Sequence, residues 1–291
     1  MDAPMRSLLY TPGHRAELIA RVLDGGLAAT PDVALLDLED GVPEAERENA
    51  RRVLAEAIAP SRGRSLRFVR VGRSSSDAAE ADLAAVVRLG LDGIVVSKVA
   101  RAEELAIVDE MLGERERAAG LAEMSVRVIA AIESAAGLLD APRIARAPRV
   151  AGLMFGSEDF AADLGLPAHR EGEAADLVYA RSAIVVAAAA ARVLAFDGIW
   201  ANFKDEAGLR ADALRGRRLG FAGRQCIHPD QIAIVNEIYA PSEEEIAHAR
   251  RIVSAFEDGV GRGLGAVGLD GEMLDAPIVE RARRTIKTAG G

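Results

Sequence analysis

The sequence predicts an α/β protein built as a (β/α)₈ TIM barrel with a C-terminal helical, lid-like extension. Two observations carry this prediction. Short apolar or β-branched runs alternate with long stretches of helical spacing, which is typical of parallel strands in a sheet covered by helices. There are eight such runs. Eight repeats fit a closed barrel better than an open sheet, which would more often carry a glycine-rich phosphate loop after its first strand.

The predicted elements follow one another in a regular order. Each strand is a short apolar run that ends in polar or turn residues, and each helix is rich in Ala, Leu, Arg and Glu. The predicted strands are residues 7–10, 33–38, 66–71, 93–97, 126–132, 151–155, 198–202 and 225–227. The predicted helices are centred on residues 15–27, 43–58, 77–89, 102–118, 137–145, 174–194 and 206–219.

The texture of the sequence changes after Asn236. Ser242 and Glu245 form a capping box that predicts a helix as far as about Glu257. The glycine-rich stretch 258–271 is predicted to be a mobile loop, and residues 277–286 a final helix. We therefore expect a catalytic barrel domain at 1–238 and an appended helical extension at 239–291. Glycine-rich segments of this kind often serve as lids.

Composition narrows the class of protein. The chain has 291 residues, half of them hydrophobic, which is ample for a buried core. Its net charge is 36 − 45 = −9, which argues against a general nucleic-acid binder. The single cysteine, Cys226, allows no internal disulfide and no cysteine-based zinc site. Without a signal peptide or a long apolar stretch, the sequence predicts a cytoplasmic protein that does not enter a membrane.

Charged side chains follow the predicted strands at their carboxyl ends. In a barrel these ends meet at one face, where the catalytic groups of this fold lie. Six strand ends carry polar residues at once, so we interpret them as one site rather than as separate solvated loops. The candidate residues from this pattern are Glu39, Asp40, Arg70, Lys98, Glu133 and Asp159.

These residue types indicate a hard cation and an acidic substrate. Carboxylates that converge without a Cys/His set favour Mg²⁺, which binds one or two protein carboxylates and keeps positions for water and substrate. Glu133 and Asp159 are the candidate ligands. Arg70 offers a planar fork for a substrate carboxylate. Lys98 has two interpretations, a Schiff-base lysine or an ion-pair partner that positions a carboxylate, and we favour the ion pair.

Several motifs occur together in a fixed order. They are RSLLYTPG at 6–13, LDLED at 36–40, IES at 132–134, GSED at 156–159, IHP at 227–229, YAPS at 239–242 and LDGEMLDAP at 269–277. This ordered set resembles the citrate lyase beta subunit and its relatives in the HpcH/HpaI aldolase superfamily, among them malyl-CoA and citramalyl-CoA lyases. The resemblance covers nearly the whole chain.

The resemblance implies a reaction and a set of roles. The family makes or breaks a carbon–carbon bond in 3-hydroxyacyl thioesters such as malyl-, citramalyl- or citryl-CoA, giving a 2-oxo acid and an acyl-CoA. Coenzyme A is then part of the substrate. Glu133 and Asp159 would hold Mg²⁺, with Mn²⁺ as an alternative, and Arg70 would hold the carboxylate of the oxo acid. Glu39 and Asp40 would order metal-bound water or support Arg70. Further candidate substrate-binding residues are Pro12, Gly13 and Arg15, together with Glu133.

The resemblance also assigns a role to the tail. In malyl-CoA and citramalyl-CoA lyases a lid covers a neighbouring subunit's site and supplies an aspartate, which here would be Asp275, with Asp270 a weaker choice. This implies a homotrimer or a hexamer of trimers. The competing interpretation is that Asp275 only caps a helix. No histidine is an obvious proton-transfer group, because His169 and His248 are expected on a solvated loop and helix.

Two departures from the family leave the substrate open. The family usually has asparagine where this chain has Gly72, and proline where it has Ser97. Three other functions remain as alternatives. They are a thioesterase acting at the same site, a metal-dependent aldolase acting on free 2-oxo acids, and a non-catalytic subunit of a complex.

Overall fold

The computed structural model describes residues 3–58, 64–72, 77–167, 175–261, 263 and 265–290. Within these residues the chain forms two compact units. One comprises residues 5–236, and the other comprises residues 237–290 together with residues 3–4. His169, considered above, lies outside the described residues.

The larger unit is a closed barrel of eight parallel strands. Each strand pairs with the next along the chain, and β8 pairs with β1 to close the ring. The strands are β1 (Ser7–Pro12), β2 (Val33–Asp37), β3 (Leu66–Val71), β4 (Gly93–Val96), β5 (Arg127–Ile132), β6 (Val150–Phe155), β7 (Leu194–Asp197) and β8 (Gly223–Cys226). This arrangement confirms the predicted TIM barrel.

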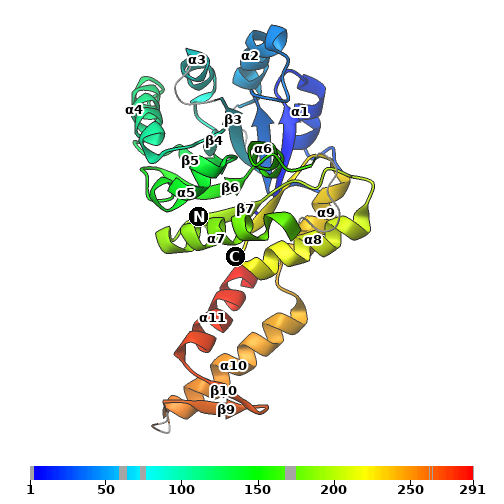
Figure 1. The fold of residues 1–291 in the computed structure, drawn as a ribbon, viewed down its shortest axis with the longest axis vertical. Coiled ribbons are helices and arrows are strands. Elements are labelled where there is room, and N and C mark those ends of the chain that lie inside the picture. Colours follow the sequence, from blue (N-terminus) through cyan, green and yellow to red (C-terminus); the bar gives the residue numbers. More distant parts are fainter. Residues whose placement is uncertain are drawn as a thin grey trace. The chain divides into compact units, whose positions relative to one another are not determined.

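Helices connect the strands and flank them on the outside of the barrel (Figure 1). They are α1 (Ala16–Leu23), α2 (Arg47–Ala57), α3 (Asp77–Val86), α4 (Ala102–Ala118), α5 (Ala135–Ile144), α6 (Ser157–Asp163), α7 (Val178–Ala191), α8 (Glu206–Leu219) and α9 (Asp230–Tyr239). Single 3₁₀ turns, η1 (Glu44–Glu46) and η2 (Ala175–Leu177), precede α2 and α7. The predicted bounds of α4 and α8 agree with the structure, whereas α6 and α9 were not predicted.

Large apolar side chains fill the inside of the barrel. Leu8, Leu35, Phe68, Ile129 and Phe196 belong to one buried cluster, to which the seven strands β1 to β7 contribute residues. Because side chains alternate along a strand, one set of apolar residues fills the barrel and the other packs against the helices. Both sets are buried, so the strands read as near-continuous apolar runs, and this is why the sequence shows them clearly.

The prediction of a seventh strand at residues 198–202 is wrong. The strand is β7, and the segment 198–202 follows it as a loop. The predicted helix 174–194 ran too far, because the alanine-rich α7 passes into an apolar strand without an intervening glycine or proline. The break is made by Arg192, which adopts a left-handed conformation at φ 59°. Helices that end in this conformation usually do so at glycine, so the end of a helix at an arginine is hard to predict from the sequence.

The smaller unit is a helical hairpin. Helices α10 (Glu243–Gly261) and α11 (Ala276–Gly290) run side by side in opposite directions, with the strands β9 (Val267–Leu269) and β10 (Glu272–Leu274) between them in the chain (Figure 1). Ala249, Ile252, Leu274, Val279 and Ala282 form its own small core. This part of the chain therefore has an apolar cluster independent of the barrel.

The structure tests the predicted features of this hairpin in turn. The capping box is confirmed, since Glu245 N donates to Ser242 Oγ at 3.1 Å and Ser242 N to Glu245 Oε2 at 2.8 Å. The mobile loop predicted at 258–271 is wrong over its described parts. Helix α10 continues to Gly261, and β9 pairs with β10 in an antiparallel ribbon. The cross-strand pairing outweighs the local preference of the glycines.

No helix in the described part of the chain is both long enough and apolar enough to cross a membrane.

Candidate active site

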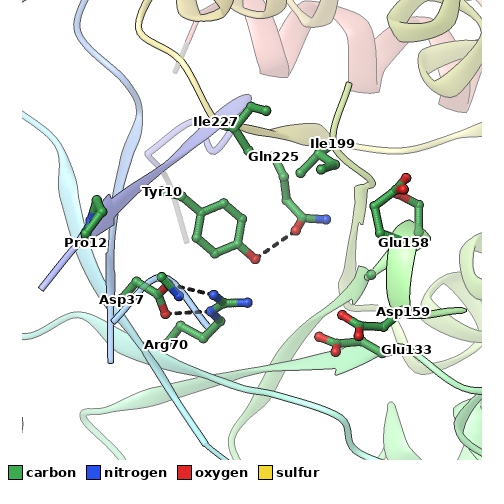
Figure 2. A pocket seen from close by; sticks show the side chains of 13 residues that line it. Tyr10, Pro12, Asp37, Arg70, Glu133, Glu158, Asp159, Ile199, Gln225 and Ile227 are labelled. Carbon is green, nitrogen blue, oxygen red and sulfur yellow. Dashed lines mark hydrogen bonds and ion pairs between the residues drawn. The ribbon is translucent and has the colours of Figure 1, made fainter. Parts of the chain in front are cut away.

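A cavity of about 310 Å³ opens at the carboxyl ends of the barrel strands (Figure 2). Its wall is formed by residues from β1, β2, β3 and β8 and by residues from the segments that follow β2, β5, β6, β7 and β8. The lining residues are Tyr10, Pro12, Asp37, Gly41, Arg70, Glu133, Gly156, Ser157, Glu158, Asp159, Ile199, Gln225 and Ile227. The predicted convergence of strand-end polar residues therefore holds for Arg70, Glu133 and Asp159.

Strand register places an acid against Arg70. Asp37 at the end of β2 is the register partner of Arg70 on β3. Its carboxylate accepts from Arg70 Nε at 2.7 Å and from Arg70 Nη2 at 2.6 Å, in a two-pronged contact. Burial alone would lower the pKa of Arg70, but the hydrogen bonds that it donates to Asp37 raise this pKa. Asp37 was not among the predicted site residues, although it lies within the LDLED motif.

Close backbone approach holds Asp37 in this position. A Cβ atom on Gly41 would lie 2.4 Å from Asp37 Oδ2, and one on Gly13 would lie 2.5 Å from Asp37 O. Gly41 N and Glu39 N both donate to the Asp37 carboxylate, at 2.8 and 2.9 Å. Gly13 N donates to Asp37 O at 2.8 Å. In the structure Gly13, predicted to bind substrate, thus braces the end of β2.

Glu39, Asp40 and Lys98 form an ion cluster next to Arg70. Lys98 Nζ lies 2.8 Å from Glu39 Oε1 and 3.2 Å from Asp40 Oδ1, while Arg70 Nη1 lies 3.1 Å from Glu39 Oε2. Burial lowers the pKa of Lys98, yet its bond to Glu39 outweighs this and raises it. A Schiff-base lysine needs a neutral amine, so the geometry favours the ion-pair interpretation.

Glu133 and Asp159 lie across the cavity from Asp37 and Arg70 (Figure 2). Glu133 ends the β5 segment and is 7% exposed, whereas Asp159 is an exposed residue in the first turn of α6. Gly156 makes room for the Glu133 side chain, because a Cβ there would lie 2.4 Å from Glu133 Cγ. Burial, together with the charges of Glu39 and Asp159, raises the pKa of Glu133 to about 7.

The Glu133 carboxylate fits a cation ligand. Its Oε2 atom is buried and has no hydrogen-bond partner among the described residues, which is costly for a charged oxygen unless a positive group approaches it. Among the described residues no group of three or more His, Cys, Asp or Glu side chains could hold a metal ion. Two protein carboxylates with room for water and substrate match the preference of Mg²⁺ rather than that of zinc.

Tyr10 and Gln225 were missed at the sequence level, yet both line the cavity. Tyr10 Oη lies 2.9 Å from Gln225 Oε1, and the Arg70 guanidinium lies 4.7 Å from the centre of the Tyr10 ring. Burial raises the pKa of the Tyr10 phenol. A single Tyr or Gln in an apolar strand does not by itself indicate a binding site. The two residues are 215 positions apart, so the sequence does not show that they meet.

Of the remaining predicted site residues, one lines the cavity and the others lie elsewhere on the chain. Pro12 lines the cavity, whereas Arg15 is an exposed residue that pairs with Glu17 at 2.6 Å. Asp275 lies in the helical hairpin, at the N-cap of α11, where its Oδ1 accepts from Ile278 N at 3.3 Å. The weaker candidate, Asp270, is an exposed residue that forms an ion pair with Arg251. The helix-capping interpretation of Asp275 is therefore realised in the structure.

The fold and the site together define a class of protein: a TIM-barrel enzyme with an acidic pocket and a fixed arginine at the carboxyl ends of its strands. Residues 6–229 match the family model described as HpcH/HpaI aldolase/citrate lyase. The chain belongs to this family, and it is an enzyme of the lyase type.

Individual relatives are similar over nearly their whole length. The citrate lyase subunit beta of Leuconostoc mesenteroides is 35% identical, covering 98% of this chain and 93% of the relative. A (3S)-malyl-CoA thioesterase of Cereibacter sphaeroides is 34% identical, covering 98% and 95%. The crystal structure of CitE from Mycobacterium tuberculosis, in complex with magnesium, acetoacetate and coenzyme A, has a TM-score of 0.80, 32% identity and full coverage of both chains.

Proposed function

We propose that this protein is a Mg²⁺-dependent carbon–carbon lyase that cleaves or forms a 3-hydroxyacyl-CoA thioester such as malyl-, citramalyl- or citryl-CoA. The observation that carries the proposal is the buried, unpartnered oxygen of Glu133 facing Arg70 across one cavity. A cation beside Glu133 and an arginine opposite it suit a substrate that carries a carboxylate next to a hydroxyl group. The bound magnesium and coenzyme A of the similar CitE structure support this assignment.

Glu133 and Asp159 would hold the metal ion, and Mn²⁺ is an alternative to Mg²⁺. When bound, the ion supplies Lewis-acid stabilisation of the oxygen that gains negative charge as the bond breaks. Because its pKa is raised to about 7, Glu133 titrates within the neutral range, and a bound cation would favour its ionised form.

Arg70 is assigned to the substrate carboxylate. A guanidinium has five N–H donors. Two serve Asp37, and Nη1 faces Glu39 at 3.1 Å and Asp40 at 3.7 Å, so at least one N–H on Nη2 is left for the substrate. Asp37 fixes the plane of the guanidinium, and the ion cluster of Glu39, Asp40 and Lys98 holds its other side. Such prior fixing lowers the entropic cost of orienting the substrate.

The reaction needs two proton movements. Cleavage breaks the bond between C2 and C3 of the acyl chain. The C3 hydroxyl releases its proton to water and becomes the carbonyl of the 2-oxo acid. The electron pair of the broken bond passes to C2 as a thioester enolate, which takes up one proton, so no net proton is gained or lost. We assign the proton on C2 to Asp275 from the hairpin of a neighbouring subunit, in a homotrimer or a hexamer of trimers.

A second candidate is hydrolysis of the thioester at the same site. The whole-length similarity to a (3S)-malyl-CoA thioesterase favours it specifically. In that case water attacks the thioester carbonyl, and free CoA leaves with the hydroxy acid intact. Acidic side chains around a bound cation suit either reaction, so the products must decide between them.

The deciding experiment is a panel of acyl-CoAs with glyoxylate, pyruvate or oxaloacetate, with and without Mg²⁺. A lyase gives hydroxyacyl-CoA from one pairing and cleaves it in reverse, whereas a thioesterase releases free CoA and hydroxy acid. Metal-dependent turnover of free 2-oxo acids alone would indicate an aldolase. Absence of any turnover would indicate a subunit that works only within a complex.

A further inference from the structure

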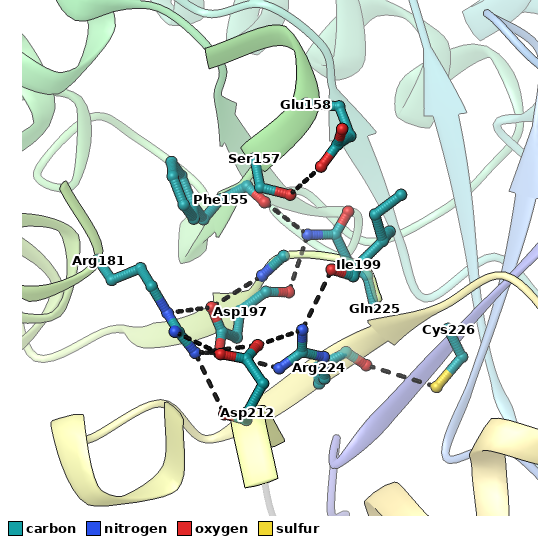
Figure 3. Close-up of polar contacts among 11 residues, drawn as sticks. Phe155, Ser157, Glu158, Arg181, Asp197, Ile199, Asp212, Arg224, Gln225 and Cys226 are labelled. Carbon is teal, nitrogen blue, oxygen red and sulfur yellow. Dashed lines mark hydrogen bonds and ion pairs between the residues drawn. The ribbon is translucent and has the colours of Figure 1, made fainter. Parts of the chain in front are cut away.

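The amide of Gln225 has only one orientation available to it. The residue is 4% exposed, and its Nε2 atom lies 2.8 Å from Phe155 O and 2.9 Å from Asp197 O, at the ends of β6 and β7 (Figure 3). Both partners are carbonyl oxygens, which only accept hydrogen bonds. The NH₂ group must therefore face them, and the amide oxygen must face Tyr10.

This orientation fixes the hydroxyl proton of Tyr10. Gln225 Oε1 lies 2.9 Å from Tyr10 Oη and can only accept, so the phenol is the donor. The sulfur of Met154, 3.7 Å away, is a weak acceptor and competes poorly for the proton. A phenol has a single proton, and with this one committed, the Tyr10 oxygen presents lone pairs to the cavity.

We propose that Tyr10 is a specificity-determining residue that accepts a hydrogen bond from the hydroxyl group of the substrate, its polarity being set by Gln225. Figure 2 places the phenol oxygen in the space bounded by Arg70, Gln225 and the two carboxylates of Glu133 and Asp159. The role is recognition rather than acid catalysis. Burial keeps the phenol protonated, and its proton points away from the cavity.

The inference names a feature of the substrate class, and in this respect it rests on the proposed function. A hydroxy acid can donate to Tyr10, a 2-oxo acid cannot, and an acid lacking both groups makes no contact. Arg70, stacked on the Tyr10 ring, would hold the neighbouring carboxylate. Tyr10 and Arg70 together would therefore recognise a hydroxyl group adjacent to a carboxylate.

The test uses L-malate and succinate, which differ by one hydroxyl, as titrants in isothermal calorimetry with Mg²⁺ present. The wild-type protein is expected to bind malate about fivefold to tenfold more tightly than succinate. Tyr10→Phe should abolish this preference by weakening malate binding and leaving succinate binding unchanged. Equal affinity for the two acids in the wild-type protein, or no binding of either, overturns the inference.

A second variant tests the polarity itself. Gln225→Met removes the acceptor, so the Tyr10 proton can turn into the cavity and donate to a carbonyl. The preference between malate and oxaloacetate should shift toward oxaloacetate by about fivefold or more. An unchanged preference in a folded variant overturns the role of Gln225.

Gln231→Met is the matched control. Gln231 is also a buried glutamine on the barrel, with Nε2 on Trp200 O at 2.9 Å and Oε1 accepting from Ile227 N at 2.8 Å, and it does not contact Tyr10. The Gln231→Met variant should keep the wild-type preference between malate and succinate and the wild-type preference between malate and oxaloacetate. A Tyr10-dependent preference for malate in a protein that cleaves no thioester would mean that the proposed function alone is wrong.

Discussion

Two groups of charged residues in the barrel unit differ in their charge balance. Between β7, β8, α7 and α8, the side chains of Arg181, Arg224, Asp197 and Asp212 are each no more than 2% exposed, and each acid contacts both arginines (Figure 3). Two positive and two negative charges balance. Buried charges of this kind need such pairing, because desolvation is costly and an unpaired partner is strongly unfavourable.

The cavity cluster does not balance. In the described part of the chain its acids are Asp37, Glu39, Asp40, Glu133, Glu158 and Asp159, and its cations are Arg70 and Lys98. Among the described residues the buried Oε2 atom of Glu133 has neither a hydrogen bond nor an ion pair, whereas Glu39 Oε2 has only its ion pair with Arg70. The comparison teaches that charge balance marks the structural network, whereas an unneutralised negative charge in a cavity marks the site for a cation and its ligand.

The largest expected effect comes from removing the cation ligands. Glu133→Ala and Asp159→Ala should each lower kcat/KM by about a thousandfold or more, because each removes a carboxylate that holds the ion. Their melting temperatures should stay near that of the wild type, since Glu133 has no protein partner at Oε2 to lose. Steady-state kinetics with Mg²⁺ and thermal melts measure the two quantities. Full activity in EDTA-treated protein would contradict the assignment.

A substitution in the charge-balanced network of Arg181, Arg224, Asp197 and Asp212 should instead lower the stability of the protein. Asp212→Ala leaves two buried arginines short of a partner, and we expect it to lower the free energy of unfolding by about 3–5 kcal/mol. Urea denaturation measures the change. The control is Glu206→Ala on the same helix, whose exposed pair with Arg210 should be worth less than about 0.5 kcal/mol. Similar losses in both variants would remove the distinction between the two regions.

The next effect concerns Asp275, for which capping and catalysis must be separated. Asparagine caps a helix as well as aspartate but cannot transfer a proton. If Asp275 is catalytic, Asp275→Asn should keep the stability of the protein and lower kcat by about a hundredfold. Wild-type kcat in this variant would leave helix capping as the whole role of the residue.

A mixing experiment then decides which subunit Asp275 serves. Inactive Asp275→Ala and Glu133→Ala proteins are combined under conditions of subunit exchange. Sites shared between subunits give some sites with both intact residues, so activity should return. A mixture that stays inactive would show that no site is shared.

Arg70→Lys should have a smaller effect. Lysine keeps the charge but loses the planar fork that holds Asp37 and the substrate together, and we expect kcat/KM to fall by about 10–100-fold. The loss should appear with every carboxylate-bearing substrate. Wild-type kcat/KM in the lysine variant would exclude Arg70 from the site.

The smallest effect is expected at Gly72, next to the end of β3. A Cβ at this position would meet no atom of the described residues within 4 Å, so Gly72→Asn should change the free energy of unfolding by less than about 1 kcal/mol. The added amide should change the ratio of kcat/KM for glyoxylate and pyruvate by about tenfold at most. A large loss of stability with unchanged preference would contradict this.

Sequence by itself determined the barrel and half of the site. Parallel strands buried on both faces are apolar throughout, so seven of the eight strands could be located, and acids directly after apolar runs pointed to Glu133 and Asp159. The seventh strand was misplaced because Arg192 ends the preceding helix without a glycine. The β9–β10 ribbon was missed because its pairing overrides the glycine-rich composition of the segment.

Tertiary structure alone decided which side chains meet. The register of β2 and β3 sets Asp37 against Arg70, and closure of the barrel between β8 and β1 brings Gln225 to Tyr10. The polarity of a hydrogen bond depends on every neighbour of the donor and the acceptor, and those of Gln225 come from β1, β6 and β7. Periodicity reports which face of a strand is buried, but contacts between distant strands depend on how the sheet closes.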